Sequence, residues 1–208
     1  MQYRLLESGA RILNAGSASV RYGTNCLNVD IQEKSGVDVV CDLHDLPLSP
    51  SQFDGVICNA VLQYCQRPRT VIREFRRVLQ AGGYLFADVP WVQPYCPDTV
   101  ALDRFRFSED ALRDICSEFA ILDIGASIRP GSAFAMLGVR IAGSLTSNRY
   151  LNFLLARIAA ALLYPFRRIR TARESRTAGA FYVVCRKIAR CSVVQGMGSE
   201  PAGSEQSG

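Results

Sequence analysis

Three positions that could bind a nucleoside come directly after short apolar runs of the chain. Asp30 ends the run "LNVD", where an acid can accept hydrogen bonds from the hydroxyls of a ribose. Asp42 follows "VDVVC" and can accept from an exocyclic amine, while the backbone N–H of Leu43 can donate to a ring nitrogen. Gly16 lies in the small-residue turn "AGSAS" (15–19), whose backbone a ligand can approach closely. Each feature alone fits ordinary turn chemistry, but together they predict an adenosine site.

These positions meet only if the apolar runs form one sheet. Short β-branched runs bounded by Gly, Ser, Asn and Asp predict strands, and they alternate with helical patterns. That alternation predicts an α/β fold with a doubly wound, mostly parallel sheet and helices on both faces. Ligands of such sheets bind at the carboxyl ends of the strands. The expected strands cover residues 11–15, 27–29, 37–41, 53–62, 84–90, 119–124 and 180–187.

Two helices have clear sequence signals. One is expected to begin at Pro68, with an apolar face that includes Ile72 and Phe75, and to end at Gly82-Gly83. The second is expected after Ser108, a good N-cap followed by two acids, with a buried stripe over residues 111–119.

The order of these pieces resembles the class I S-adenosylmethionine-dependent methyltransferases, in particular the small type 11 family. "RILNAGSASVRYG" resembles the family's first motif, "LNVDI" its ribose-binding strand and "DVVCDLHDLPL" its adenine loop. The run 53–90 resembles its fourth strand, the following helix and its fifth strand. "LDRFRFSEDALRDIC" looks like its aspartate–aromatic–arginine element, and "AGAFYVVCRK" like its last strand.

The resemblance implies a Rossmann-like fold and an enzyme that transfers a methyl group from S-adenosylmethionine to a small molecule or to a glycan- or lipid-linked acceptor. An in-line displacement of this kind depends mainly on positioning the donor and the acceptor. Asn59, Asp103 and Arg106 are the implied substrate-positioning candidates, although Asp103 and Arg106 could equally form a simple i,i+3 pair. The implied cofactor-binding residues are Asn14, Gly16, Ala18, Asp30, Asp42, Leu43 and Asn59.

Two departures from the family's pattern keep other functions open. The family usually has an acid at the position of Asn14, which can still bond backbone amides in the turn, and a second glycine at the position of Ala18. A methyltransferase-like partner or scaffold with weakened or lost cofactor binding is therefore the alternative. A nicotinamide-dependent oxidoreductase ranks last, because "GSASVR" lacks the second glycine of its fingerprint.

The remaining candidate groups carry little chemistry. His44, the only histidine, is expected to be a solvated loop residue. None of the eight cysteines forms a CxxC pair, so no metal site is expected, and reduced thiols in a cytoplasmic protein are favoured. The net charge of +5 is concentrated in residues 167–176 and is too small to indicate a nucleic-acid partner.

Residues 131–178 are expected to form an apolar and basic helical insertion within a single domain that covers residues 1–190. As a helix, residues 150–166 would be about 25 Å long, too short to span a bilayer. The favoured interpretation packs this helix on the sheet or on a second subunit, as in a homodimer. The alternative is a peripheral membrane contact through residues 150–170. The polar tail 191–208 is expected to be disordered.

Overall fold

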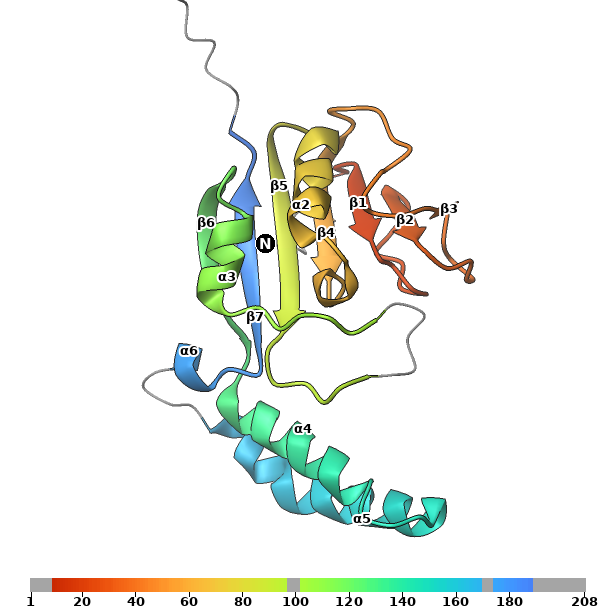
Figure 1. The fold of residues 1–208 in the computed structure, drawn as a ribbon, viewed down its shortest axis with the longest axis vertical. Helices are drawn as coiled ribbons and strands as arrows, with labels where there is room; N and C mark the ends of the chain where they lie inside the picture. The colour runs from red at the N-terminus through yellow and green to blue at the C-terminus, as the bar shows by residue number, and fades with distance from the viewer. Residues whose placement is uncertain (1–8, 97–101, 170–173, 189–208) are drawn as a thin grey trace, which may run out of the picture.

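The computed structural model describes residues 9–96, 102–169 and 174–188, which are organised around a seven-stranded sheet (Figure 1). The strand order is β3-β2-β1-β4-β5-β7-β6, with β1 to β5 paired in parallel and β7 antiparallel to both its neighbours. This confirms the predicted mostly parallel sheet. The strands are β1 (Ile12–Ala15), β2 (Cys26–Asp30), β3 (Val39–Val40), β4 (Phe53–Asn59), β5 (Leu79–Pro90), β6 (Ala120–Ile128) and β7 (Ala180–Arg186).

The main core lies between the sheet and two helices, α2 (Pro68–Val78) and α3 (Glu109–Ile115), which cover the same face. Val71 and Phe75 of α2 and Leu112 of α3 are fully buried there. The connections from β1 to β2 and from β2 to β3 contain no helix. In the part of the chain that the structure describes, the other face of β1, β2 and β4 carries a small cluster of Ile12, Cys26 and Ile57, against which Tyr22 of the first connection packs. The predicted Rossmann-like fold, a mostly parallel sheet with packed helices, is confirmed.

The local helix signals are partly confirmed. Pro68 begins α2, and the Ser108 side chain caps α3 by accepting a hydrogen bond from the Ala111 N–H at 3.2 Å. The prediction that Gly82-Gly83 end the first helix is wrong, because α2 ends at Val78 and the chain enters β5 at once. Leu79 has extended dihedrals and pairs with Phe53. Gly82, with φ +79°, instead lies in an irregular stretch of β5 before Tyr84 resumes the pairing.

Residues 130–168 form a helical hairpin between β6 and β7. It consists of α4 (Pro130–Ala142), α5 (Arg149–Leu163) and the 3₁₀ turn η2 (Tyr164–Arg168), and the short α6 (Glu174–Thr177) follows it. Gly138 lets the two helices approach closely, because a Cβ there would lie 2.4 Å from Leu163 Cδ1. Asn148 caps α5 through the N–H groups of Tyr150 and Leu151.

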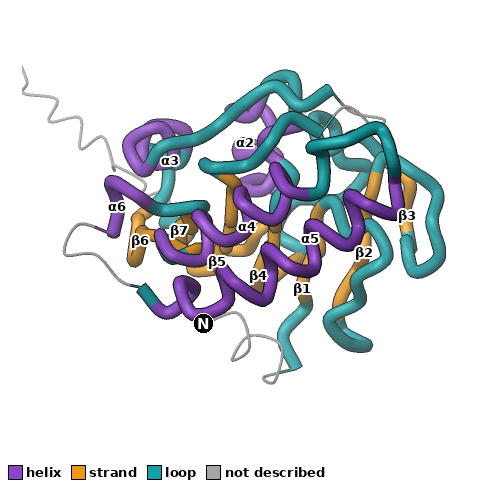
Figure 2. The backbone as a smooth tube through the Cα atoms, turned by 90° about the horizontal axis from the view of Figure 1, so that it is seen from below, coloured by secondary structure: helices purple, strands orange, loops and turns teal. Residues whose placement is uncertain are grey.

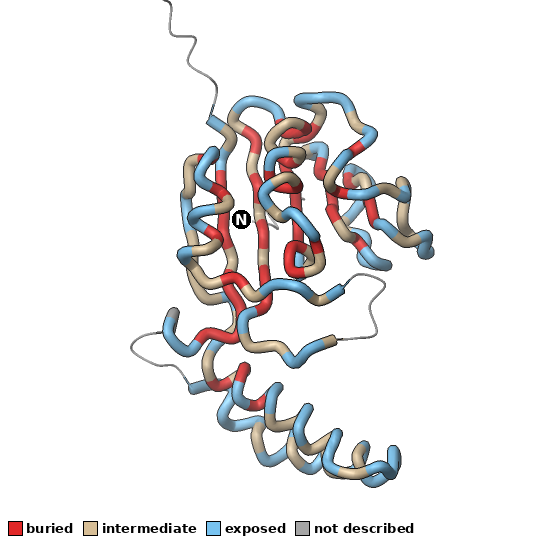
Figure 3. Tube along the Cα trace, viewed as in Figure 1, coloured by how far each residue is buried: buried red, intermediate tan, exposed pale blue. Residues whose placement is uncertain are grey.

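The hairpin projects beneath the carboxyl edge of the parallel strands, as two perpendicular views show (Figures 1 and 2). No residue of α5 is buried, and the hairpin is mostly exposed while the strands are mostly buried (Figure 3). Of the two packings expected for residues 150–166, the one on the sheet is wrong, since α5 packs on α4 and η2; packing on a second subunit stays a prediction. In the described part of the chain no helix is long and apolar enough to cross a membrane. The predicted disordered tail, residues 191–208, lies outside the described residues.

Candidate cofactor site

The turn after β1 brings the backbone to the carboxyl edge of the sheet. Gly16 has φ +71°, and a Cβ on it would lie 2.3 Å from Val61 Cγ2, so only glycine fits there. Ala18 also has a positive φ, +50°, a conformation that costs a residue with a Cβ about 1–2 kcal/mol. The backbone therefore keeps the shape of a glycine turn although the sequence has a single glycine in it.

Asp30 holds this turn against the end of β2. Its Oδ2 accepts from the Ala18 N–H at 2.8 Å and its Oδ1 from the Gln32 N–H at 2.9 Å, and the residue is only 8% exposed. A carboxylate oxygen can accept two hydrogen bonds, so each Asp30 oxygen retains one acceptor site. Asp30 thus fixes the turn and can still accept from a diol.

Asn14 faces away from the cavity that these residues line. Its Nδ2 donates to the Val20 carbonyl at 2.9 Å and to Asn28 Oδ1 at 3.0 Å. Asn28 in turn donates from Nδ2 to Asp38, whose pKa is lowered by the backbone and side-chain hydrogen bonds from Asn28. Asn14 thus bonds the backbone of the turn, at the Val20 carbonyl, with its side-chain amide as the donor. A carboxylate could not make either bond.

The loop after β3 is fixed by a histidine that uses both ring nitrogens. His44 Nδ1 lies 2.5 Å from Asp42 Oδ1, and Nε2 accepts from the Arg67 N–H at 3.1 Å at the start of α2. Because Nε2 is an acceptor, Nδ1 carries the proton and the ring is neutral. Desolvation opposes ionisation of Asp42, but the hydrogen bonds from His44 prevail and lower its pKa.

The interpretation of His44 as a solvated residue is therefore wrong, because its side chain is 14% exposed and is bonded on both sides. The sequence gives no signal for this contact, since Arg67 lies 23 residues further along the chain. Leu43, the residue before His44, is buried, and the two hydrogen bonds of the His44 ring hold it in place.

One cavity of about 640 Å³ collects six of the predicted residues at the carboxyl edge: Gly16, Ala18, Asp30, Asp42, Leu43 and Asn59. Gly16 and Asn59 come from neighbouring strands, β1 and β4, where the strand order reverses, which is the usual place for a ligand in such sheets. Sequence reasoning missed the other lining residues because they lie in loops whose path no local pattern fixes. They are Ile31, Gln32, Lys34, His44, Ala60, Val61, Tyr64, Cys65, Gln66, Leu102 and Arg104.

Asp103 and Arg106 form a tight pair beside this cavity rather than in its wall. Arg106 donates to both carboxylate oxygens of Asp103, at 2.7 Å to Oδ2, and Nη2 also reaches the Gln93 carbonyl at 3.2 Å. The Asp103 side chain is 1% exposed, and hydrogen bonds from Arg106 lower its pKa although desolvation opposes them. The pair fixes the segment on which Leu102 and Arg104 face the cavity.

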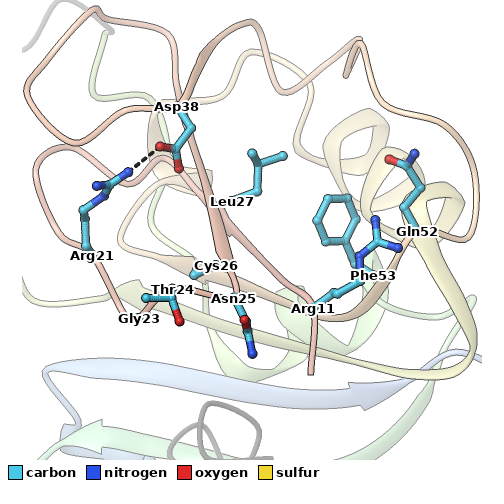
Figure 4. A pocket seen from close by; sticks show the side chains of 10 residues that line it. All are labelled: Arg11, Arg21, Gly23, Thr24, Asn25, Cys26, Leu27, Asp38, Gln52 and Phe53. Atoms are coloured by element: carbon cyan, nitrogen blue, oxygen red, sulfur yellow. Dashed lines mark hydrogen bonds and ion pairs between the residues drawn. The ribbon is translucent and has the colours of Figure 1, made fainter. Parts of the chain in front are cut away.

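A second hollow, of about 1000 Å³, lies at the opposite end of the sheet (Figure 4). Its residues precede β1, β2 and β4, as Arg11, Asn25 and Gln52 do, and the labelled side chains spread around an open basin. The Arg21–Asp38 ion pair closes one side of it. It shares no residue with the cavity at the carboxyl edge.

Two cysteines in and near the cavity wall, Cys65 and Cys58, are poorly reactive because they are buried. Burial raises the pKa of the Cys65 thiol, which borders the cavity, to about 12, and burial raises that of Cys58 as well. A thiol that stays protonated is a poor nucleophile. Within the described ranges no three acids, histidines or cysteines are grouped so that they could hold a metal ion.

A family model described as a methyltransferase domain matches residues 13–87, the segment that contributes most of the cavity. The match covers about a third of the chain, so residues 13–87 resemble a methyltransferase domain. The Rossmann-like sheet described above is the fold of the class I methyltransferases, and S-adenosylmethionine is the cofactor of that class.

Known proteins resemble this chain over short stretches or at low identity. A stretch of 60 residues is 35% identical to an uncharacterized protein of Methanocaldococcus jannaschii and covers 28% of this chain and 29% of that protein, so the match spans less than a third of this curated relative. A putative sarcosine dimethylglycine methyltransferase from Galdieria sulphuraria superposes with a TM-score of 0.57 at 13% identity, over 90% of this chain and 82% of that one.

The Burkholderia thailandensis 1,6-didemethyltoxoflavin-N1-methyltransferase, solved with 1,6-didemethyltoxoflavin and S-adenosylhomocysteine, gives a TM-score of 0.56 at 15% identity. The superposition covers 90% of this chain and 75% of that chain. At such identities the likeness establishes the fold and leaves the acceptor open.

Proposed function

We propose that the protein is an active methyltransferase that binds S-adenosylmethionine in the cavity at the carboxyl edge. Its acceptor is a small molecule or a glycan- or lipid-linked compound. The observation that supports this most is the convergence of Gly16, Asp30, Leu43 and Asn59 on one cavity from four separate segments. Separate segments converge in this way when they contact one ligand.

The cavity suits the cofactor in size and in chemistry. About 640 Å³ lies within the range of roughly 300–1,000 Å³ that small-molecule and cofactor sites occupy. The missing Cβ of Gly16 leaves room for the backbone of a ligand-binding turn against Val61. Lys34 and Asp42 add one charge of each sign to the wall.

Each residue of the wall has a definite task in this proposal. Asp30 accepts from the ribose hydroxyls with the acceptor sites that its turn leaves free, and the backbone beside Leu43 contacts the adenine. Asn59 lies at the end of β4 and positions the acceptor. When bound, S-adenosylmethionine supplies an electrophilic methyl group attached to sulfur. The protein then contributes mainly by aligning the acceptor with that group and by excluding water.

The loop residues enclose the acceptor's side of the cavity. Tyr64, in the 3₁₀ turn η1 (Leu62–Tyr64), and Leu102 supply apolar surface, and Arg104 adds a positive charge. Asp103 and Arg106 act as positioning residues, because they hold the segment that carries Leu102 and Arg104. Their removal is expected to raise KM for the acceptor more than the Kd for the cofactor.

Titration calorimetry with S-adenosylmethionine tests the proposal. We compare the native protein with Asp30→Asn, which removes acceptor capacity but keeps the side-chain size. Asp38→Asn is the matched control, since Asp38 also accepts from a backbone N–H near the end of a strand but borders the opposite hollow. Micromolar binding that weakens at least about tenfold only in Asp30→Asn, a loss of about 1.4 kcal/mol, supports the site.

A methyltransferase-like partner or scaffold with weakened cofactor binding is the second candidate. Two features favour it: the strained φ of Ala18, and the Asn14 side chain, which faces away from the cavity. Neither residue is the type that the family's pattern has at its position. Absence of binding at millimolar cofactor, from a protein that unfolds cooperatively, would exclude the active enzyme and favour this candidate.

A further inference from the structure

The α4–α5 hairpin has an extended apolar face that nothing in the described chain covers. On α4 the exposed residues Phe134, Leu137 and Ile141 recur at spacings of three and four, so they form one row. On α5 Leu151, Ile158 and Leu162 recur at spacings of seven and four and also form one row, and Leu162 is 69% exposed. A monomer that leaves so much contiguous apolar surface in water normally uses it for an interaction.

Both rows lie on the same side of the hairpin. The helices meet through Gly138 of α4 and Leu163 of α5, and they are antiparallel because Gly143 faces the earlier residue Ala156. Successive residues of a helix are rotated by about 100°, so the position of each apolar row relative to the residue that touches the other helix can be calculated. Viewed from the N-terminus of its own helix, each row is rotated in the same direction from that contact residue. Because the helices are antiparallel, rotation in the same direction brings both rows to one face of the pair.

The charge of the segment is entirely positive. Between Asp123 and Glu174 the sequence contains no acid and no lysine, and its eight charged residues are all arginines: Arg129, Arg140, Arg149, Arg157, Arg167, Arg168, Arg170 and Arg173. The segment therefore carries more positive charge than the whole protein's net charge of +5, and the rest of the chain is net negative.

The arginines surround the apolar face rather than interrupt it. Arg149 lies at the turn end of α5 and Arg167 in η2 at its other end, and Arg157 lies on another side of α5, over the ring of Phe153 at 5.7 Å. Two arginine–tyrosine contacts, Arg149 on Tyr150 and Arg167 on Tyr164, also place aromatic rings beside the charges. Apolar side chains flanked by tyrosines and arginines are the composition of helices that lie in a membrane interface.

We infer that this face docks on the surface of an anionic phospholipid bilayer, with α5 lying in the interface and the arginines contacting the headgroups. Charge complementarity distinguishes this partner from a second copy of the chain. In a symmetric dimer through this face, the same arginine-rich segment would meet itself with no acid to pair with. An anionic bilayer offers the apolar depth and the negative charge together.

The docking itself does not depend on the proposed function, but its consequence for the acceptor does. The hairpin lies beneath the carboxyl edge of the sheet, the edge that carries the cavity (Figures 1 and 2). If the proposed methyl transfer holds, the docked protein receives its acceptor at the membrane surface, which favours a lipid-linked acceptor over a freely diffusing one.

Vesicle co-flotation of the full chain tests the docking, with vesicles of phosphatidylcholine alone and vesicles with roughly one phosphatidylglycerol in three lipids. We expect binding to the anionic vesicles, little binding to the neutral ones, and a loss of affinity as salt is raised. Ile158→Glu is expected to weaken binding at least about tenfold by placing a charge on the buried face. Arg149→Gln, at the turn end of α5, is expected to weaken it about fivefold and to reduce its salt dependence.

Leu122→Glu is the matched control, since Leu122 is a half-exposed leucine of β6 outside the hairpin. It should bind vesicles as the native chain does. Circular dichroism and thermal unfolding verify that each variant is folded. Three results would overturn the inference: no binding to anionic vesicles, binding that Ile158→Glu leaves unchanged, or a dimer in sedimentation that Ile158→Glu dissociates. Calorimetry with S-adenosylmethionine tests the proposed function separately, so that either can fail without the other.

Discussion

The Ala18 N–H donates to Asp30 Oδ2 at 2.8 Å, and this bond holds an alanine in a conformation that suits glycine. The carboxylate at the end of β2 thus compensates for a residue type that the turn does not favour. The site's geometry and its strain come from the same pair of residues.

Replacing Ala18 by glycine should relieve this strain. We expect Ala18→Gly to stabilise the fold by up to about 1 kcal/mol and to tighten S-adenosylmethionine binding severalfold. The reason is that glycine adopts the positive φ of this turn without steric strain. Urea unfolding and calorimetry measure the two effects. Ser51→Gly is the control: Ser51 also has a positive φ, +56°, but does not line the cavity, so only stability should rise. Weaker cofactor binding in Ala18→Gly would contradict the argument.

Restoring an acid at position 14 should damage this protein. The Asn14 amide donates to the Val20 carbonyl and to Asn28 Oδ1, and a carboxylate would face both acceptors without a proton to share. We expect Asn14→Asp to destabilise the fold by about 1–3 kcal/mol at neutral pH, the cost of an unsatisfied buried polar group. Urea unfolding tests this. A variant as stable as the native chain would mean that the network around Asn28 can rearrange.

The neutral ring of His44 links the loop after β3 to the start of α2. His44→Ala removes the acceptor for the Arg67 N–H and should destabilise the protein by about 1–2 kcal/mol. It should also weaken cofactor binding, because Leu43 loses its support. In His44→Gln the side-chain oxygen can replace Nε2, so much of the stability should return. Thermal unfolding distinguishes the two, and equal losses would argue against the hydrogen bond as the cause.

Acid should destabilise the protein partly through Asp38. Hydrogen bonds from Asn28 lower the pKa of Asp38 in the folded state, so its stabilisation is present above the unfolded value of about 3.9 and is lost as the pH falls through the lower folded value. Asp38→Asn should be less stable than the native chain at pH 7, and the difference should shrink towards about pH 3. Urea unfolding at both pH values measures it, and a constant difference would exclude this linkage.

The sequence predicted the sheet and the ends of its strands more reliably than anything between them. Gly16, Asp30 and Asn59 could be located because parallel strands bring their carboxyl ends to one edge whatever the loops do. Lys34, Tyr64 and Arg104 could not, since their approach to the cavity depends on loops of irregular path. The orientation of Asn14 depended on Asn28 and Asp38, a network that no single segment reveals.

For the helix α5 the sequence identified the apolar residues but not the element on which they pack. Its apolar residues predicted packing on the sheet or on a second subunit, but small residues on α4 let the neighbouring helix pack closely instead of the sheet. Hydrophobic periodicity indicates that a face will be covered and does not identify by what. The connection between β1 and β2 contains no helix, as the turn residues of 16–25 indicate.

The position of β7 determines when this chain can fold. It inserts between β5 and β6, yet it is the last strand among the described residues and follows the entire hairpin. During synthesis β5 and β6 therefore keep unpaired edges until residues 180–186 leave the ribosome. The β5–β7 contacts, which form last, join residues that lie far apart in the sequence, and such contacts form slowly. Such open edges promote aggregation, so the nascent chain depends on rapid completion or on chaperones until its final strand closes the sheet.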